Sequence, residues 1–386
     1  MTLPSIVEAL TQTHYPWPLS PRQSQVLGRL SRCRTPAMGG RIAKCDNCRA
    51  TDTMYYSCRD RHCPQCQSLA KERWLEDRKS ELLPVDYYHV VFTIPHELNS
   101  LARANPKTLY NILHKAAWKT IKTLGADQKR LDGKMGMTSF LHTWGQQINH
   151  HIHLHCIVPG GAISTDKKQW NPAKSTYLFP VRAMSRVFRG SFVSQLRSAY
   201  KEQKLDFHGQ SKAYEEKAAF DQLLNVLMGK EWVVYCKPPL PTGKPVLNYL
   251  SQYTFKIAIS NHRIVSMTQR QVTFRWKDYR DNNKVKTTTL DRCELLRRYL
   301  LHVLPAGFMR IRHYGFLGSR YKQKNLDLIR RLLRAAPVIR KVKPAENYIE
   351  QMRRVTGKEL DQCKVCKQGR MKFVTDIPRF RQLAPD

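Results

Sequence analysis

The stretch Asn149–Val158 reads NHHIHLHCIV and combines the pattern of a β-strand with a high density of histidines. Alternate side chains of a strand lie on the same face. We therefore expect His151, His153 and His155 on one face, while the hydrophobic residues between them pack into a core. Three imidazoles are costly to bury without a ligand, and together they can bind one divalent ion. The sequence thus predicts a metal site at these three histidines.

Further strand and helix patterns surround this stretch. Tyr87–Ile94 and Met137–Trp144 are rich in β-branched and aromatic residues, which predicts two more strands. Residues 106–124 begin with a proline and stop before Gly125, as is typical of a helix. Other segments show helical periodicity at about 67–83, 185–203, 211–229, 291–303 and 322–335, and strand patterns at 232–236 and 263–290.

A helix is expected from Pro245 to about Ala258, and it carries two tyrosines. Tyr249 and Tyr253 are spaced i, i+4, and Lys256 follows on the same helical face. Alone, such a tyrosine pair is more typical of packing. Together with a metal-binding strand, these groups could transesterify a phosphodiester, because a metal ion polarises the phosphate, a phenol attacks it and a cation offsets the charge.

Two C-x-x-C pairs near the N-terminus predict a zinc site. The chain has eleven cysteines, an odd number, which indicates metal binding in a reducing compartment rather than disulfides. Two such turns can supply the four thiolates of a closed, structural Zn²⁺ site. The predicted ligands are Cys45, Cys48, Cys63 and Cys66.

The other cysteines leave alternatives open. Cys33, Cys58 and His62 could form a second zinc site, exchange with one of the first four ligands, or be two buried thiols and a surface histidine. Cys363 and Cys366 could be half of a site completed by ligands from elsewhere, or a pair of free thiols.

The charge of the chain indicates a polyanionic partner. Lys and Arg number 66 and Asp and Glu 30, which gives a net charge of +36. Nucleic acid is the first candidate and an anionic membrane surface the second. No apolar run approaches the ~18–20 residues that a spanning helix needs, and no secretory signal is visible, so we expect a cytoplasmic, nucleoid-associated protein without membrane partners.

The chain resembles the HUH endonucleases, in which a His-hydrophobe-His strand is followed by one or two tyrosines on a helix. It is most similar to the rolling-circle, two-tyrosine transposases of the insertion sequence 91 family. The resemblance spans nearly the whole chain, with ordered matches at CRTPAMGG (33–40), SCRDRHCPQCQ (57–67), YYHVVFTIPHELNSLARANP (87–106), HIHLHCIVPGGAIS (151–164), YLSQYTFKIAISNHRI (249–264) and LLHVLPAGFMRIRHYGFLG (300–318).

This resemblance implies an α+β fold with an HUH-like core, in which a central antiparallel sheet is flanked by helices and preceded by a zinc-binding domain. It implies metal ligands at His153 and His155, with His151 as the third, and nucleophiles at Tyr249 and Tyr253. The expected domains are 1–83 for zinc and DNA binding, 84–303 for catalysis and 304–386 as a basic C-terminal region.

Two positions depart from the family pattern. Phe255-Lys256 stands where relatives often have a His-Arg type pair, although a basic group is kept. The C-terminal knuckle lacks the glycine that often follows its second cysteine, Cys366.

The implied reaction is metal-assisted cleavage and joining of single-stranded DNA at the element ends and the target, through a 5′-phosphotyrosine and a free 3′-OH. Mg²⁺ or Mn²⁺ would be the catalytic ion and Zn²⁺ the structural one. No phosphate-binding G-x-x-x-x-G-K-[ST] loop is present, so cleavage is expected to need no ATP. Host helicase and replication proteins are the expected partners.

Two other functions are compatible with the sequence. A plasmid or phage replication initiator would use the same chemistry. A non-catalytic zinc-containing regulator would account for the charge and the cysteines but not for the histidines and tyrosines. A transposase built on three carboxylates is not favoured, because no acidic residue flanks the histidine strand.

Overall fold

The structure is a computed structural model. It describes residues 2–11, 17–173, 176–241, 245–246, 249, 255, 257–337, 346–357 and 359–379. The chain forms two compact units, each assembled from segments distant in sequence. Unit 1 contains Met1–Trp74, Ile259–Val303 and Arg340–Asp386, and unit 2 contains Leu75–Ala258 and Leu304–Ile339.

This division differs from the three consecutive domains expected at 1–83, 84–303 and 304–386. The chain leaves unit 1 within helix α3 (Ser68–Lys79), returns to it after Ala258, and visits unit 2 once more from Leu304. Sequence patterns are local, so they group neighbouring segments into one domain. They do not indicate that the chain re-enters a unit that it has left.

Unit 2 is built on a five-stranded antiparallel sheet, which confirms the predicted α+β class. The strands, in their spatial order, are β13 (Ile311–Gly315), β5 (Gly136–Trp144), β6 (His150–Pro159), β3 (Tyr87–Thr93) and β9 (Val234–Cys236). The histidine strand is β6, and it lies at the centre of the sheet. The predicted strands at Tyr87–Ile94 and Met137–Trp144 are its two neighbours.

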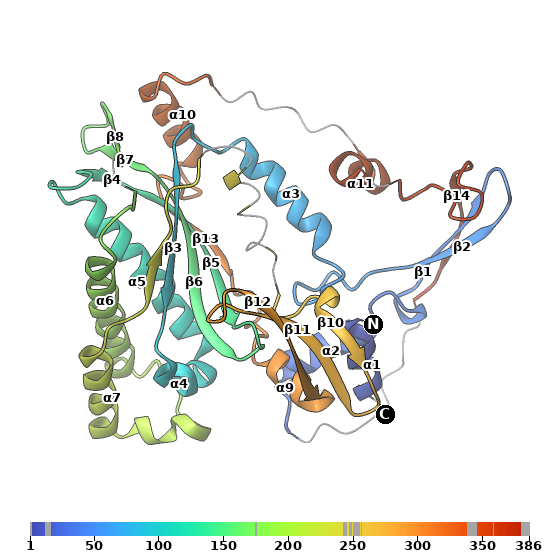
Figure 1. Ribbon diagram of the computed structural model, residues 1–386, viewed down its shortest axis with the longest axis horizontal. Helices are drawn as coiled ribbons and strands as arrows, with labels where there is room; N and C mark the ends of the chain where they lie inside the picture. The colour runs from blue at the N-terminus through green and yellow to red at the C-terminus, as the bar shows by residue number, and fades with distance from the viewer. Residues whose placement is uncertain are drawn as a thin grey trace. The chain divides into compact units, whose positions relative to one another are not determined.

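Helices cover one face of this sheet (Figure 1). They are α4 (Asn99–Ala104), α5 (Pro106–Gly125), α6 (Val181–Lys201) and α7 (Lys217–Gly229). From β6, Ile152, Leu154 and Cys156 enter the core between sheet and helices, as the alternation predicts. Burial of a large apolar side chain contributes about 1.5–3 kcal/mol, so this one-sided core fixes which face of β6 carries the histidines.

Smaller elements complete unit 2. A three-stranded sheet contains β4 (Gly133–Lys134), β7 (Gly161–Ser164) and β8 (Trp170–Pro172). Helix α10 (Lys322–Leu332) buries Leu326 and Ile329 in a second apolar cluster with Leu83, Ile163 and Phe316. This cluster fixes the segment that follows β13 within the unit.

Unit 1 contains two small sheets and several short helices. One sheet has the order β14 (Met371–Ile377), β1 (Gly40–Cys45) and β2 (Thr51–Tyr55), and the other joins β10 (Ile264–Met267), β11 (Gln271–Asp278) and β12 (Lys284–Asp291). Its described residues also form the α-helices α1 (Leu3–Thr11), α2 (Pro21–Ser31), α9 (Arg292–Leu300) and α11 (Tyr348–Thr356). No helix among the described residues is both long and apolar enough to span a membrane.

Local sequence accounts for several helix starts in unit 1. Ser20 and Gln23 form a reciprocal capping box at α2, and Asn347 and Glu350 do so at α11. Asp291 caps α9 by accepting a hydrogen bond from the backbone N–H of Cys293 at 2.7 Å. These caps satisfy donors that a helix leaves unpaired at its first turn.

Candidate active site

Three histidine side chains converge on the face of the sheet opposite the helices. His142 on β5 pairs in register with His153 on β6, and His155 lies two residues further along β6. One nitrogen of each ring lies within 4.8 Å of the others, and the Nε2 atoms of His153 and His155 are 3.1 Å apart. Three converging imidazole nitrogens are a donor set that fits a divalent metal ion.

His142, rather than His151, completes this cluster. The strand alternation does place His151 on the same side as His153, but its side chain is exposed and lies outside the group of converging nitrogens. A strand rises ~3.3 Å per residue, so His151 and His155 are about 13 Å apart along β6. Pairing with the neighbouring strand brings His142 much closer. The signal for His142 was its place in the adjacent predicted strand, but only the register reveals it.

A fourth histidine connects the cluster to a tyrosine. His89 on β3 is 2% exposed, and its Nε2 lies 2.8 Å from His155 Nδ1. Its other nitrogen, Nδ1, is hydrogen-bonded to the hydroxyl of Tyr249 at 2.5 Å. Burial, followed by the nearby Lys237 and His153, lowers the pKa of His89 to about 3. His89 is therefore neutral at physiological pH, with one nitrogen as donor and the other as acceptor.

Tyr249 lies against this histidine chain. Its ring meets His89 edge-on with centroids 4.9 Å apart, and the Lys237 ammonium lies 5.4 Å from the ring centroid. Lys237 directly follows β9, and its backbone N–H donates to the carbonyl of His89 at 3.0 Å. The residue after an edge strand of the sheet thus places a cation beside the phenol. No local sequence pattern marks Lys237 or His89, because the positions of both side chains depend on strand pairing.

Two of the predicted catalytic residues lie outside the described residues. Of the predicted tyrosine helix, Pro245, Val246 and Tyr249 are described and helical, whereas Tyr253 and Lys256 are not described. Phe255, Ile257 and Ala258 are described and are not helical, so the predicted end of the helix at about Ala258 is wrong. Their expected roles, Tyr253 as a nucleophile and Lys256 as a cation, stay predictions.

Eight cysteines form two groups of four. In the first, Cys33, Cys58, Cys63 and Cys66 have all their sulfurs within 4.8 Å of one another. The Sγ of Cys66 lies 3.5 Å from that of Cys33 and 3.7 Å from that of Cys58. A tetrahedral ion with Zn–S bonds of ~2.3 Å requires sulfurs about 3.8 Å apart, so this group fits Zn²⁺.

The grouping differs from the predicted one, in which Cys45 and Cys48 joined Cys63 and Cys66. Cys45 and Cys48 lie at the tip of the β1–β2 hairpin, with Cys363 and Cys366. Cys33 and Cys58 lie outside the hairpin's open end, about five residues of strand away from its tip. At ~3.3 Å per residue, this length separates the two C-x-x-C pairs too far for one ion.

His62 lies outside both groups of cysteines. Its Nδ1 is 2.8 Å from a carboxylate oxygen of Asp60, which is 3% exposed and also pairs with Arg29 at 3.2 Å. The hydroxyl of Tyr299 donates to the backbone carbonyl of His62. His62 therefore fastens the loop that carries Cys58 and Cys63 to its surroundings in unit 1.

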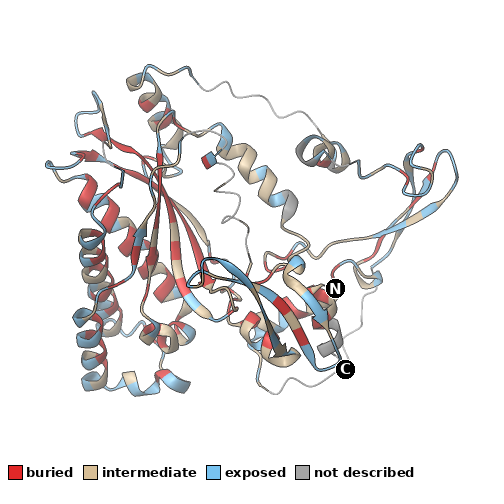
Figure 2. Cartoon of the chain, in the orientation of Figure 1, coloured by how far each residue is buried: buried red, intermediate tan, exposed pale blue. Residues whose placement is uncertain are grey.

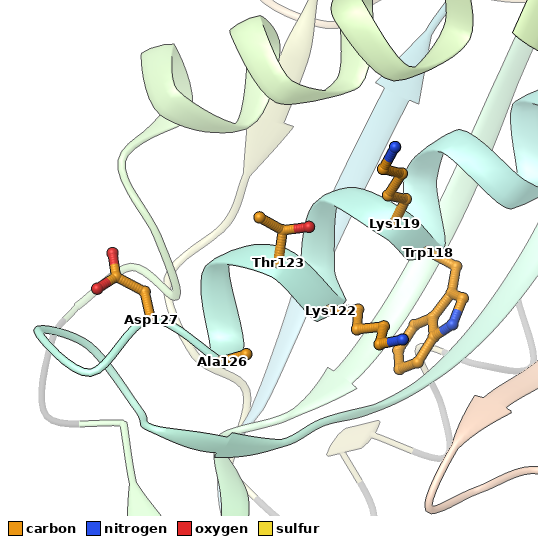
Figure 3. A pocket seen from close by; sticks show the side chains of 6 residues that line it. All are labelled: Trp118, Lys119, Lys122, Thr123, Ala126 and Asp127. Carbon is orange, nitrogen blue, oxygen red and sulfur yellow. The ribbon is translucent and has the colours of Figure 1, made fainter. Parts of the chain in front are cut away.

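A shallow pocket lies elsewhere, at the C-terminal end of α5 on the helical side of the sheet (Figure 3). Its lining residues are Trp118, Lys119, Lys122, Thr123, Ala126 and Asp127. Trp118 stacks on Tyr314 with ring centroids 5.5 Å apart, so this lining residue also packs α5 against β13. None of the lining residues belongs to the histidine or cysteine clusters.

Comparison with known proteins identifies two matching families. Residues 136–325 match the family described as "Putative transposase", and residues 5–94 match the family described as "Transposase zinc-binding domain". The first range contains the three clustered histidines and Tyr249. The second contains the first cysteine group with Cys45 and Cys48, and it ends before Cys363 and Cys366.

Two curated relatives align over most of the chain. "Putative transposase y4qJ" of Sinorhizobium fredii (strain NBRC 101917 / NGR234) is 44% identical over 354 residues, which cover 92% of this chain and 89% of the relative. The "Transposase for insertion sequence element IS801" of Pseudomonas savastanoi pv. phaseolicola is 24% identical over 319 residues, which cover 81% of this chain and 74% of the relative.

Proposed function

Because the chain belongs to the insertion sequence 91 family of transposases, we propose that it nicks and joins single-stranded DNA at the ends of its element through a 5′-phosphotyrosine link. Membership of this family makes DNA the substrate, and cleavage with strand transfer the activity. Beyond this, we propose that the DNA is single-stranded, that the nucleophile is a tyrosine and that transposition follows a rolling-circle mechanism.

One observation carries the proposal: the hydroxyl of Tyr249 is joined through His89 to His155 of the histidine cluster. A phenol at this place lies beside a group of side chains that could hold a metal ion. Lys237 adds a positive charge next to the same ring. A nucleophile, a metal site and a cation are the parts that phosphodiester transesterification requires.

His142, His153 and His155 would hold the catalytic ion, Mg²⁺ or Mn²⁺. When bound, the ion would polarise the scissile phosphate as a Lewis acid. The cluster offers nitrogen ligands, and nitrogen ligands suit Mn²⁺ better than the oxygen-preferring Mg²⁺. We therefore favour Mn²⁺ as the ion that supports the highest rate.

Tyr249 would act as the first nucleophile. The phenol loses its proton to solvent, its oxygen attacks the phosphorus, a P–O bond to the tyrosine forms, and the bond to the 3′ oxygen of the neighbouring nucleotide breaks. The leaving oxygen takes up a proton and becomes a free 3′-OH. The phosphodiester is conserved in the link, so the 3′-OH can prime synthesis by host replication proteins, and Tyr253 can perform the second cleavage.

His89 would position Tyr249 and stabilise its ionised form. If His155 coordinates through Nε2, its proton resides on Nδ1 and is donated to His89 Nε2. The proton of neutral His89 then lies on Nδ1, which donates to the oxygen of Tyr249. In this tautomer His89 cannot accept the phenol proton, so His89 acts as a hydrogen-bond donor to the phenolate.

A nicking assay tests the proposal. Labelled single strands that carry either element end are incubated with the protein and Mn²⁺, and the products are resolved on a denaturing gel. We expect a free 3′-OH fragment and a 5′ fragment bound to protein, and neither from the Tyr249→Phe/Tyr253→Phe double variant. Tyr279, which is 65% exposed, supplies the control variant Tyr279→Phe. Equal nicking by the double variant and the control would contradict the proposal, as would wild-type protein that binds DNA but never cuts it.

A further inference from the structure

We propose that Cys45, Cys48, Cys363 and Cys366 bind a second Zn²⁺, and that this ion fastens the C-terminal segment to the N-terminal sheet of unit 1. The matched zinc-binding domain ends at residue 94, so it does not include half of these ligands. The inference is independent of the nuclease chemistry, because it concerns other side chains in another unit.

The sulfur positions fit a closed tetrahedral site. All four Sγ atoms lie within 4.8 Å of one another. The Sγ of Cys45 is 3.7 Å from that of Cys366, and the Sγ of Cys48 is 3.6 Å from that of Cys363. These distances match the roughly 3.8 Å that ~2.3 Å Zn–S bonds impose on a tetrahedron. Each C-x-x-C turn therefore supplies two ligands to one point.

Backbone N–H groups point at the sulfurs from both turns. The N–H groups of Asn47 and Cys48 donate to Cys45 Sγ at 3.4 and 3.5 Å, and the N–H of Gly369 donates to Cys366 Sγ at 3.3 Å. Such donors stabilise the thiolate form, which is the form that binds metal.

Gly369 permits the close approach of the two turns. A Cβ atom at this position would lie 2.5 Å from Cys45 Sγ. The sequence has no glycine directly after Cys366, where relatives often have one. Gly369 lies three residues further along and makes room for the opposite knuckle.

The polypeptide around the site already joins the two chain regions. Strand β14 pairs with β1 from Gly40↔Ile377 to Cys45↔Met371. At the end near the cysteines, the N–H of Arg370 donates to the Asp46 carboxylate at 2.7 Å, and the N–H of Asp46 donates to the carbonyl of Arg370 at 3.0 Å. Both turns are thus held in position from the backbone.

Little apolar burial supports this sheet, as Figure 2 shows for β2 and β14. The side chains of β14 are exposed or half-buried along its whole length, with Phe373 59% exposed. Small sheets without a core on either face are marginal in water and need a staple such as a metal ion. Cys45 and Cys366 are 321 residues apart in sequence, so an ion at this site closes most of the chain into one loop.

Zinc stoichiometry of the full chain tests the proposal. Thiolate-bound zinc is released with a mercurial reagent and measured with a chromogenic chelator. We expect two equivalents in the wild type and in the control Cys293→Ser, whose thiol belongs to neither group. The Cys45→Ser/Cys48→Ser variant, the Cys363→Ser/Cys366→Ser variant and the variant with all four changes should each keep one equivalent. Loss of neither ion or of both from the C-terminal variant would overturn the proposal.

Two further measurements separate ligand loss from misfolding. Cys366→His keeps a zinc ligand and should retain two equivalents, whereas Cys366→Ser should retain one. Trypsin should cut residues 346–379 faster in Cys45→Ser/Cys48→Ser than in Cys293→Ser, although these substitutions are far away in sequence. Equal cleavage rates in these two variants would contradict a shared ion.

Discussion

The histidines of the sheet differ in the partners of their ring nitrogens. His155 has its Nε2 near His153 and its Nδ1 near His89, so both nitrogens have partners. His151 shares the strand but is exposed and lies outside the cluster. Histidines only two or four residues apart therefore have different surroundings, and substitutions at single positions can test whether their roles differ.

His142 and His151 form a matched pair for such a test. We expect His142→Ala to reduce nicking by roughly a hundredfold or more and to weaken Mn²⁺ binding, because it removes one of the three proposed ligands. We expect His151→Ala to stay within a few-fold of wild type. Nicking rates and Mn²⁺ titration by calorimetry measure both effects. The reverse order of the two variants would show that the cluster is assigned wrongly.

We expect His89 to affect Mn²⁺ binding and nicking although it is not a proposed metal ligand. We expect His89→Ala to lower Mn²⁺ affinity and nicking each by about 10–100-fold, since groups that orient a metal ligand typically have effects of this size. His96→Ala is the control, because the His96 side chain is 84% exposed. Calorimetry measures metal binding independently of the reaction. Unchanged Mn²⁺ affinity in His89→Ala would remove the link between Tyr249 and the metal site.

At the scale of elements, backbone conformation makes a separate prediction at two glycines of unit 2. Gly315, at the end of β13, has φ +61°, and a Cβ there would lie 1.9 Å from the Met135 carbonyl oxygen. Gly307 has φ +68° with open space around it. We expect Gly315→Ala to cost about 2–5 kcal/mol and Gly307→Ala about 1 kcal/mol. Chemical denaturation measures both, and equal costs would contradict the close approach.

The elements themselves were largely predictable from the sequence. The patterns at Tyr87–Ile94, Met137–Trp144 and 106–124 correspond to β3, β5 and α5 within a few residues, because periodicity, Pro106 and Gly125 act locally. The histidine cluster was only partly predictable. The alternation of polar and apolar residues predicted which face of β6 carries the histidines. The positions of His142 and His89 beside them depend on the register between strands, which local sequence does not encode.

At the scale of the whole molecule, two features could not be predicted from the sequence. The chain leaves unit 1 and returns to it twice, and Cys45 lies beside Cys366, 321 residues away. Neither composition nor spacing encodes which distant segments meet. The net charge, by contrast, can be read directly from the sequence.

The charge of +36 predicts a strong dependence of DNA binding on salt. Each phosphate that is neutralised releases counterions, and if about six are contacted, affinity for a single strand should fall roughly 300-fold between about 50 and 200 mM salt. Fluorescence anisotropy with a labelled element end measures this slope. An affinity that does not change with salt would contradict electrostatic capture of the DNA.

The central claim, that a tyrosine of the segment 249–253 attacks the DNA, is tested most directly by mapping the covalent adduct. Wild-type protein is incubated with a single-stranded element end and Mn²⁺, digested with protease and nuclease, and analysed by mass spectrometry. We expect the nucleotide on Tyr249 or Tyr253, and a shift to the remaining tyrosine when either is changed to Phe. A nucleotide on a serine, or on another tyrosine such as Tyr279 or Tyr314, would contradict the proposed mechanism.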